Sequence, residues 1–213
     1  MSTPPYRSKH PPTTFYRSVL HAWNGLVHTV VHQRNMRMHV LAGILVGLVG
    51  SGIVLGLAEK VTLIFCVLLV LFAEMLNSAL EQLVDLAIQQ FDEKAKLAKD
   101  IAAAGVLVLA IGTVVIFAAV LVHNADTIAS SVDAIKRQIW LGLPLTLVAG
   151  ALMRETSKPV LVDVGLGLVG MMLWVFSLSS TESYVFSAMV LGLLVVAMSA
   201  AAMRQRIRSA PPS

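Results

Sequence analysis

The chain has 213 residues, of which 57% are hydrophobic and only 13% charged, and its mean hydropathy is +0.80. This composition excludes a soluble globular domain and indicates an all-α polytopic membrane protein. The formal net charge is +4, but the basic residues lie at the edges of apolar runs, so we expect them to meet anionic lipid headgroups and not nucleic acid. A single cysteine, Cys66, excludes a disulfide within the chain.

The first segments of the chain are a tail and a surface helix. Residues 1–14 hold four prolines and no apolar core, which argues against a cleavable secretory signal and predicts a disordered tail. Residues 15–32 repeat apolar side chains at helical spacing, which predicts an amphipathic helix lying in the membrane interface. Residues 33–39 form a polar, basic junction that leads into the first apolar run.

Six apolar runs follow, and each is judged against the roughly 20 residues that cross a bilayer. The fourth run is short and holds Gly142, Pro144 and Gly150. With a cytoplasmic N-terminus, 13 of the 16 lysines and arginines fall on the cytoplasmic side. We therefore expect a multi-pass protein of the bacterial cytoplasmic (inner) membrane with both termini in the cytoplasm. The expected spans are 40–58, 61–82, 101–122, 139–153, 160–178 and 184–203, with residues 125–138 as an external linker before a three-span C-terminal domain, 139–213.

A stripe of polar side chains begins in the C-terminal part of the second expected span and continues beyond its end. Glu74, Asn77, Glu81 and Asp85 are spaced by three, four and four residues, so they share one helix face within an arc of about 80°. Ionisable groups near a bilayer are costly unless they face protein or water, which makes each of them a functional candidate. Carboxylates suit Mg²⁺ and a lysine suits phosphates. Lys99 and Asp100, just before the third span, complete the set for a Mg-nucleotide site.

From spacing alone, three interpretations of this stripe stay open: a polar cluster that fixes helix packing, a path for protons or ions, and a catalytic site. Transport is disfavoured because the acidic residues gather at one membrane face and no second half mirrors them. The chain has no GxxxxGK[ST] or GxGxxG loop, which excludes the familiar soluble nucleotide-binding sites. The spacing of His21, His28, His32 and His39 does not match a zinc motif.

Four sequence segments resemble one family. AEMLNSALEQLVD at 73–85 and AKLAKDIAAAGVL at 95–107 are similar to the signature of the small prokaryotic membrane diacylglycerol kinases. SVLHAWNG at 18–25 and RNMRMH at 34–39 resemble the undecaprenol kinase branch. The resemblance covers about residues 15–122. It implies a three-span lipid kinase domain over 15–124, commonly a homotrimer with active sites shared between protomers, which uses Mg²⁺ and ATP to phosphorylate a membrane lipid, diacylglycerol or undecaprenol.

The resemblance also implies roles for individual residues. Glu74 matches the general base. Asn77, Ser18 and Lys99 match residues that position the substrate or its phosphate, and Glu81 matches a metal ligand. The nucleotide-binding residues that the resemblance implies are Arg17, Glu81, Asp85, Lys99 and Asp100.

Two departures from the family pattern stand out. Where the family carries a second metal-binding glutamate, before R-N-x-R-x-H, this chain has Gln33, whose amide oxygen can bind Mg²⁺ but brings no charge. Residues 139–213 match no part of the signature and receive no assigned function. These departures motivate an alternative, namely a catalytically weak family member that serves as a membrane scaffold or lipid-binding module.

Overall fold

The structure is a computed structural model that describes residues 14–156 and 158–209. The predicted disordered tail lies outside these residues, apart from Thr14. The described residues are all-helical and contain no strand, which confirms the predicted fold class. The helices are α1 (Phe15–His32), α2 (Arg34–Ser51), α3 (Leu57–Ala87), α4 (Glu93–His123), α5 (Ala125–Ser130), α6 (Val132–Met153), α7 (Val160–Leu178) and α8 (Tyr184–Ser209).

Five of the six predicted spans lie within single helices, whereas the first, 40–58, is helical only to Ser51, and residues 52–56 connect α2 to α3. Four of these helices, α3, α4, α7 and α8, are long and apolar enough to cross a membrane. The other two, α2 and α6, begin with polar turns. Arg34 and Arg37 lie in the first turns of α2, and Asp133, Lys136 and Arg137 in those of α6. Only the C-terminal part of each of these two helices is therefore as apolar as a bilayer core requires.

The α3–α4 hairpin is longer than the apolar runs that predicted it. Helix α3 continues to Ala87, and α4 begins at Glu93, eight residues before the expected span. A helix satisfies its own backbone hydrogen bonds, so it does not have to stop where the apolar residues stop. Asp92 starts α4 as an N-cap, because its Oδ1 accepts hydrogen bonds from the backbone N–H groups of Lys94 (2.8 Å) and Ala95 (2.9 Å).

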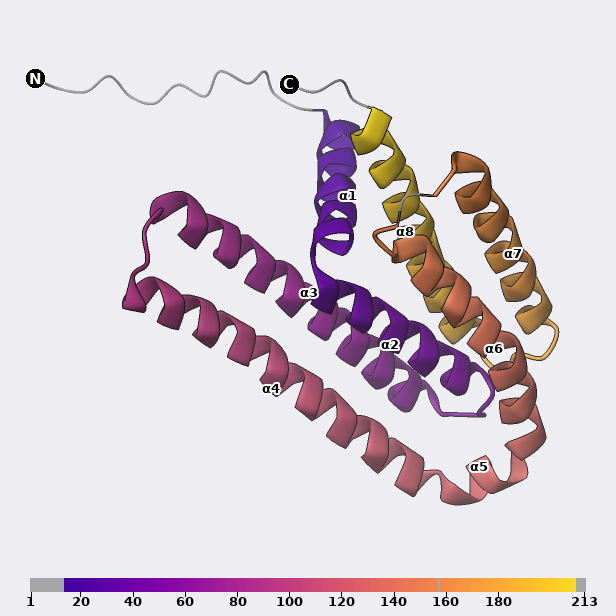
Figure 1. The fold of residues 1–213 in the computed structure, drawn as a ribbon. Helices are drawn as coiled ribbons and strands as arrows, with labels where there is room; N and C mark the ends of the chain where they lie inside the picture. The colour runs from indigo at the N-terminus through magenta and orange to yellow at the C-terminus, as the bar shows by residue number, and fades with distance from the viewer. Residues whose placement is uncertain (1–13, 157, 210–213) are drawn as a thin grey trace, which may run out of the picture.

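Helix α2 lies between the α3–α4 hairpin and the C-terminal helices (Figure 1). Close approach to α8 depends on glycines: a Cβ at Gly47 would lie 2.6 Å from Val190, and one at Gly50 would lie 2.7 Å from the ring of Phe186. One hydrophobic core joins both halves of the chain, from Val27 in α1 to Ala201 in α8. The division into two domains at 125–138 stays a prediction, and those residues form α5 and the start of α6.

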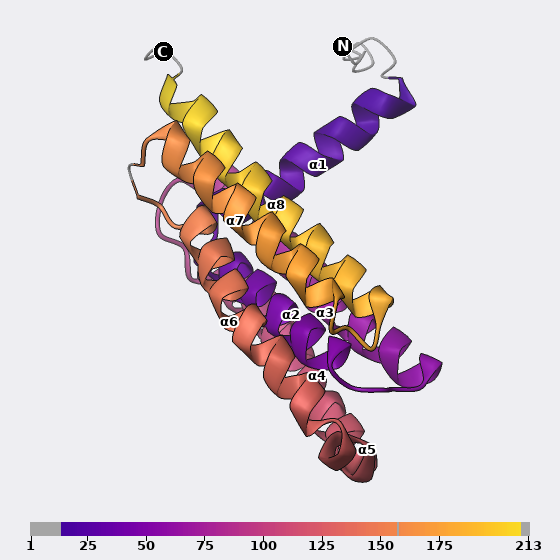
Figure 2. The same cartoon turned by 90° about the vertical axis from the view of Figure 1, so that its right-hand side faces the viewer.

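Helix α1 has the predicted bounds and leaves the bundle crosswise (Figure 2). Its C-terminal half packs against the core through Val27, Val30 and Val31. Its N-terminal half exposes Phe15 and Trp23 along with other apolar side chains. Exposed aromatic and apolar residues on an amphipathic helix suit a position in the membrane interface.

Candidate active site

The first three polar residues of the stripe on α3, Glu74, Asn77 and Glu81, are buried or half-buried. Glu74 is only 1% exposed and Asn77 only 4%, although both lie in one of the most apolar helices of the chain. Glu81, two turns after Glu74, is half-buried. Buried polar groups in such a position need partners or a function.

Glu81 is the centre of a small polar network. Its Oε1 accepts a hydrogen bond from Asn77 Nδ2 at 3.1 Å, and its Oε2 accepts one from Gln33 Nε2 at 3.4 Å. Gln33 lies 48 residues earlier in the chain, at the bend between α1 and α2. The bend therefore brings the residue that departs from the family pattern against the carboxylate expected to bind the metal.

A cavity of about 180 Å³ opens beside Glu74 and Asn77. Two residues of α2, Asn35 and His39, form its polar wall, and small and apolar residues of α4 form the opposite wall. Sequence reasoning missed Asn35 and His39 as site residues. The signal was present, because both lie in the RNMRMH segment four residues apart and thus on one helix face.

A second cavity, of about 330 Å³, lies at the turn of the α3–α4 hairpin. Asp85 and Lys99 line it and form an ion pair between the two helices. Lys96 and Asp92 line the same cavity, whereas Asp100 is exposed on α4. The hairpin thus places one lysine and one carboxylate of the predicted nucleotide site together, 11 residues beyond Glu74 along α3.

Arg17 and Ser18 are not brought to this network within the protomer. They lie in the first turns of α1, and Arg17 precedes Gln33 by 16 residues, or about 24 Å along a helix. Gln33 contacts Glu81, so α1 holds its N-terminal turns well away from the carboxylates. A role for these two residues in the same site stays a prediction.

The network offers oxygen donors suited to Mg²⁺. Asn77 Oδ1 is buried without a hydrogen-bond partner among the described residues, and it belongs to the side chain that binds Glu81. An orphaned acceptor beside a carboxylate fits a hard cation, and Mg²⁺ is usually held by one or two carboxylates together with substrate phosphates. No cluster of three or more His, Cys, Asp or Glu side chains suited to a metal occurs within residues 14–156 and 158–209. The residues therefore fit an ion that the nucleotide helps to hold.

Comparison with known proteins identifies the family. The protein-family model described as prokaryotic diacylglycerol kinase matches residues 20–121. An undecaprenol kinase of Bacillus subtilis is 33% identical over 97 residues, which are 46% of this chain and 79% of that protein. The chain belongs to the prokaryotic diacylglycerol kinase family. A diacylglycerol kinase of Synechocystis sp. is 39% identical over 100 residues, which are 46% of this chain.

The family match has clear limits along the chain. The matched segment ends at residue 121. It includes the predicted site residues Glu74, Asn77, Glu81, Asp85, Lys99 and Asp100. The chain spans 57% of the length of the Synechocystis relative. No solved structure matches the chain. The C-terminal helices α6, α7 and α8 therefore lie outside what the family model describes.

Proposed function

We propose that this protein is a lipid kinase that transfers the γ-phosphate of ATP to the hydroxyl group of a membrane lipid, either diacylglycerol or undecaprenol. The observation that carries the proposal is the burial of Glu74 and Asn77 against a cavity beside Glu81. A carboxylate buried beside a cavity within a membrane helix can meet a lipid hydroxyl without drawing the lipid out of the bilayer. The names of the two relatives agree with this class of substrate.

In the proposed reaction Glu74 is the general base. The lipid oxygen attacks the γ-phosphorus while its proton passes to the Glu74 carboxylate, and the bond between that phosphorus and the β–γ bridging oxygen breaks as ADP leaves. Asn77 positions the reacting groups through its amide, which is held by Glu81. Because phosphoryl transfer needs positioning and charge neutralisation more than covalent chemistry, this small set of side chains is sufficient.

The nucleotide would lie further along the hairpin, at the cavity lined by Asp85 and Lys99, with Asp100 next to Lys99 in the chain and exposed on α4. Lys99 supplies a positive charge for the phosphates. Glu81 would hold Mg²⁺ together with the amide oxygens of Gln33 and Asn77. The ion would neutralise phosphate charge when bound.

The proposal also includes the cellular location and the oligomeric state of the protein. We expect the inner membrane, with both termini in the cytoplasm where ATP is available, and a homotrimer. Helix α4 has one buried residue, Val106, over 31 residues, so nearly its whole surface is available to lipid or to neighbouring protomers. A neighbouring protomer is also the simplest way for Arg17 and Ser18 to reach an active site.

The alternative is a family member with weak catalysis that serves as a scaffold or lipid-binding module. The neutral Gln33 at the expected metal site is the observation that favours it. The two proposals differ in one measurable property, namely turnover.

The deciding experiment is a transfer assay with ATP labelled at the γ-phosphate. The purified full-length protein is placed in mixed micelles with Mg²⁺ and with diacylglycerol, undecaprenol or a matched lipid whose hydroxyl is acetylated. A kinase labels a free alcohol and leaves the acetylated lipid unlabelled. Absence of label with every alcohol, for a protein that still binds lipid, would leave the scaffold as the function.

A further inference from the structure

A cavity of about 350 Å³ lies at the junction of α1, the α6–α7 connection and the C-terminal end of α8. It is separate from the kinase residues and belongs mainly to the half of the chain that the family match leaves out. Its lining residues are Val31, His32, Glu155, Arg204, Ile207 and Arg208.

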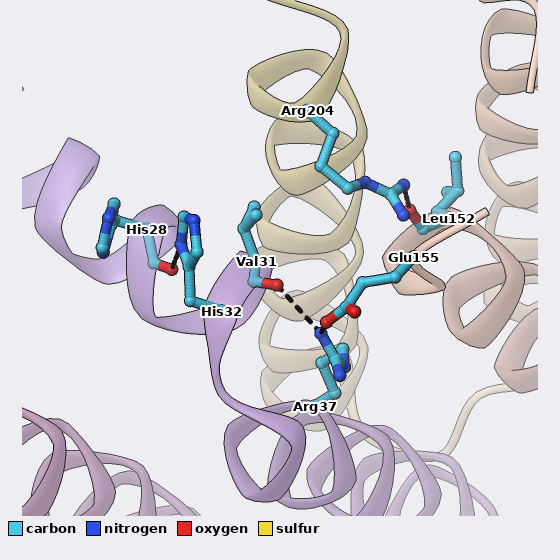
Figure 3. Close-up of polar contacts among 7 residues, drawn as sticks. All are labelled: His28, Val31, His32, Arg37, Leu152, Glu155 and Arg204. Atoms are coloured by element: carbon cyan, nitrogen blue, oxygen red, sulfur yellow. Dashed lines mark hydrogen bonds and ion pairs between the residues drawn. The ribbon is translucent and has the colours of Figure 1, made fainter. Parts of the chain in front are cut away.

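Arg204 is the unusual member of this cavity. It is only 7% exposed, yet no carboxylate lies within salt-bridge distance of its guanidinium among the described residues. One of its N–H groups donates to the backbone carbonyl of Leu152 at the end of α6 (Figure 3). Its Nε and Nη1 atoms are buried and have no hydrogen-bond partner within residues 14–156 and 158–209. Capping of α6 therefore uses only part of a group that carries five N–H donors.

The surroundings of Arg204 are positively charged. Arg208 lies one turn further along α8 on the same face and donates to the carbonyl of Thr156 at 2.8 Å. Lys158 caps the same helix end as Arg204 by donating to the carbonyl of Ala151. Burial lowers the pKa of Lys158, and the nearby Arg204 and other arginines lower it further, although Asp163 acts in the opposite direction. These cations are thus close enough to destabilise one another.

Of the described residues that line the cavity, only Glu155 is acidic, and it already has a partner. Glu155 Oε1 accepts a hydrogen bond from Arg37 at 2.6 Å, and the same guanidinium donates to the carbonyl of Val31 at 2.9 Å (Figure 3). Arg37 thus neutralises Glu155. Asp163 favours the charged form of Arg204 from a distance, but among the described residues no carboxylate forms an ion pair with it. A buried cation with free donors is stable when an anion shares its site.

We propose that this cavity binds a phosphate group through Arg204 and Arg208, with His32 at its rim. Two guanidinium groups on one helix face present fork-shaped donors that suit the oxygens of a phosphate monoester better than a single point charge would. The cavity lies where the helices α6 and α8 end, next to α1. We expect this end of the bundle to lie at the level of lipid headgroups, because α1 is amphipathic and the cavity is basic. The phosphate can therefore come from an anionic phospholipid or from free phosphate. This inference does not rest on the proposed kinase activity.

Binding is measured on the full-length protein as a rise in melting temperature at constant ionic strength, with two probes. The first probe is inorganic phosphate added to protein in phosphatidylcholine nanodiscs. The second is phosphatidic acid incorporated into those nanodiscs, with acyl chains matched to the phosphatidylcholine. Stabilisation by inorganic phosphate identifies a site for free phosphate, and stabilisation by phosphatidic acid alone identifies a site for a lipid headgroup. Either result supports the proposal.

Three substitutions make the test specific. We expect Arg204→Gln and Arg208→Gln to weaken the apparent affinity by about tenfold or more, because each removes a charged donor pair. Arg206→Gln is the matched control, since Arg206 lies on the same helix end, is exposed and does not line the cavity. If Arg204→Gln does not fold, Arg208→Gln at an exposed position provides the result. The proposal is wrong if neither probe stabilises the wild-type chain, or if Arg206→Gln weakens binding as much as Arg208→Gln.

Discussion

Gln33 donates a hydrogen bond from Nε2 to Oε2 of Glu81 across 3.4 Å, and so joins the bend after the surface helix to the polar stripe of α3. An amide can make this bond in the absence of a metal, whereas a carboxylate at position 33 would repel Glu81. The substitution of an amide for a carboxylate therefore changes both the charge of the site and its behaviour without Mg²⁺.

The first prediction concerns this pair. Gln33→Glu should lower the Mg²⁺ concentration for half-maximal phosphate transfer by about tenfold or more, because two carboxylates about 4 Å apart repel by several kcal/mol at an effective dielectric near 20 and the cation relieves that repulsion. Gln33→Ala should raise the requirement only modestly, since water can replace the amide. A Mg²⁺ titration of initial rates measures both. Identical titrations for all three proteins would mean that Gln33 has no part in metal binding.

The second prediction separates the base from the metal ligand. Glu74→Gln should reduce kcat by about 10²-fold or more with little change in the KM for ATP, the usual effect of losing a positioned base. Glu81→Gln should instead raise the Mg²⁺ requirement. Glu59→Gln is the matched control, because Glu59 lies in the first turn of the same helix, far from the site. Near-normal turnover of Glu74→Gln would remove Glu74 from the mechanism.

The third prediction concerns the ion pair of the hairpin. Lys99→Gln should raise the KM for ATP by about tenfold, because a charge that faces the phosphates is lost. The free energy of unfolding should change by no more than about 1 kcal/mol, since the Asp85 side chain is 66% exposed and exposed pairs contribute little. Lys94→Gln, one turn earlier and outside the cavity, should leave the KM unchanged. Equal effects of the two substitutions would point to general surface charge.

The fourth prediction tests the contact between the two halves of the chain. Gly47→Ala should lower the melting temperature, because its Cβ would meet the stiff side chain of Val190 at 2.6 Å and overpacking costs about 1–3 kcal/mol. Gly112→Ala in α4 meets no atom within 4 Å and should be neutral or slightly stabilising. Thermal unfolding in detergent compares the two variants. A stable Gly47→Ala protein would mean that α8 does not pack on α2 as described.

The fifth prediction concerns orientation. Figure 1 shows α5 and the α7–α8 turn at one end of the bundle and the C-terminal end of α8 at the other. In a Cys66→Ala background, cysteines at the exposed positions Ser130 and Ser179 should react with an impermeant reagent outside intact cells, and one at Ser209 should react only after lysis. Labelling of a cysteine at position 209 from outside intact cells would contradict the proposed topology.

The sequence predicts the helices better than it predicts their ends. Apolar runs indicate where a chain crosses a bilayer, but the polar turns that extend α3 to Ala87 and begin α4 at Glu93 carry no apolar signal. The fourth span is a regular helix despite Pro144, and it begins seven residues earlier than its apolar run. Its first turns are amphipathic, so a rule that counts only hydrophobic residues misses them.

The candidate sites also contain features that the sequence predicts and features that it does not. The spacing of Glu74, Asn77 and Glu81 predicts a shared face because they lie on one helix, and the structure places them there. The cavity around Arg204 could not be predicted in this way. It joins α1, α8 and a connection between two other helices, and such a junction depends on tertiary packing that helical periodicity does not encode.

The length of the hairpin relates the chemistry to the thickness of the bilayer. Helix α3 has 31 residues and is about 46 Å long, whereas a hydrocarbon core is about 30 Å thick. Measured along the helix from Val61, where the expected span begins, Glu74 lies at about 20 Å and Asp85 at about 36 Å. The base would thus lie inside a hydrocarbon core about 30 Å thick, while the ion pair would lie in water. A membrane of longer acyl chains would place Glu74 further from the level of the lipid hydroxyls, so hydrophobic matching would set the rate at which the site meets its substrate.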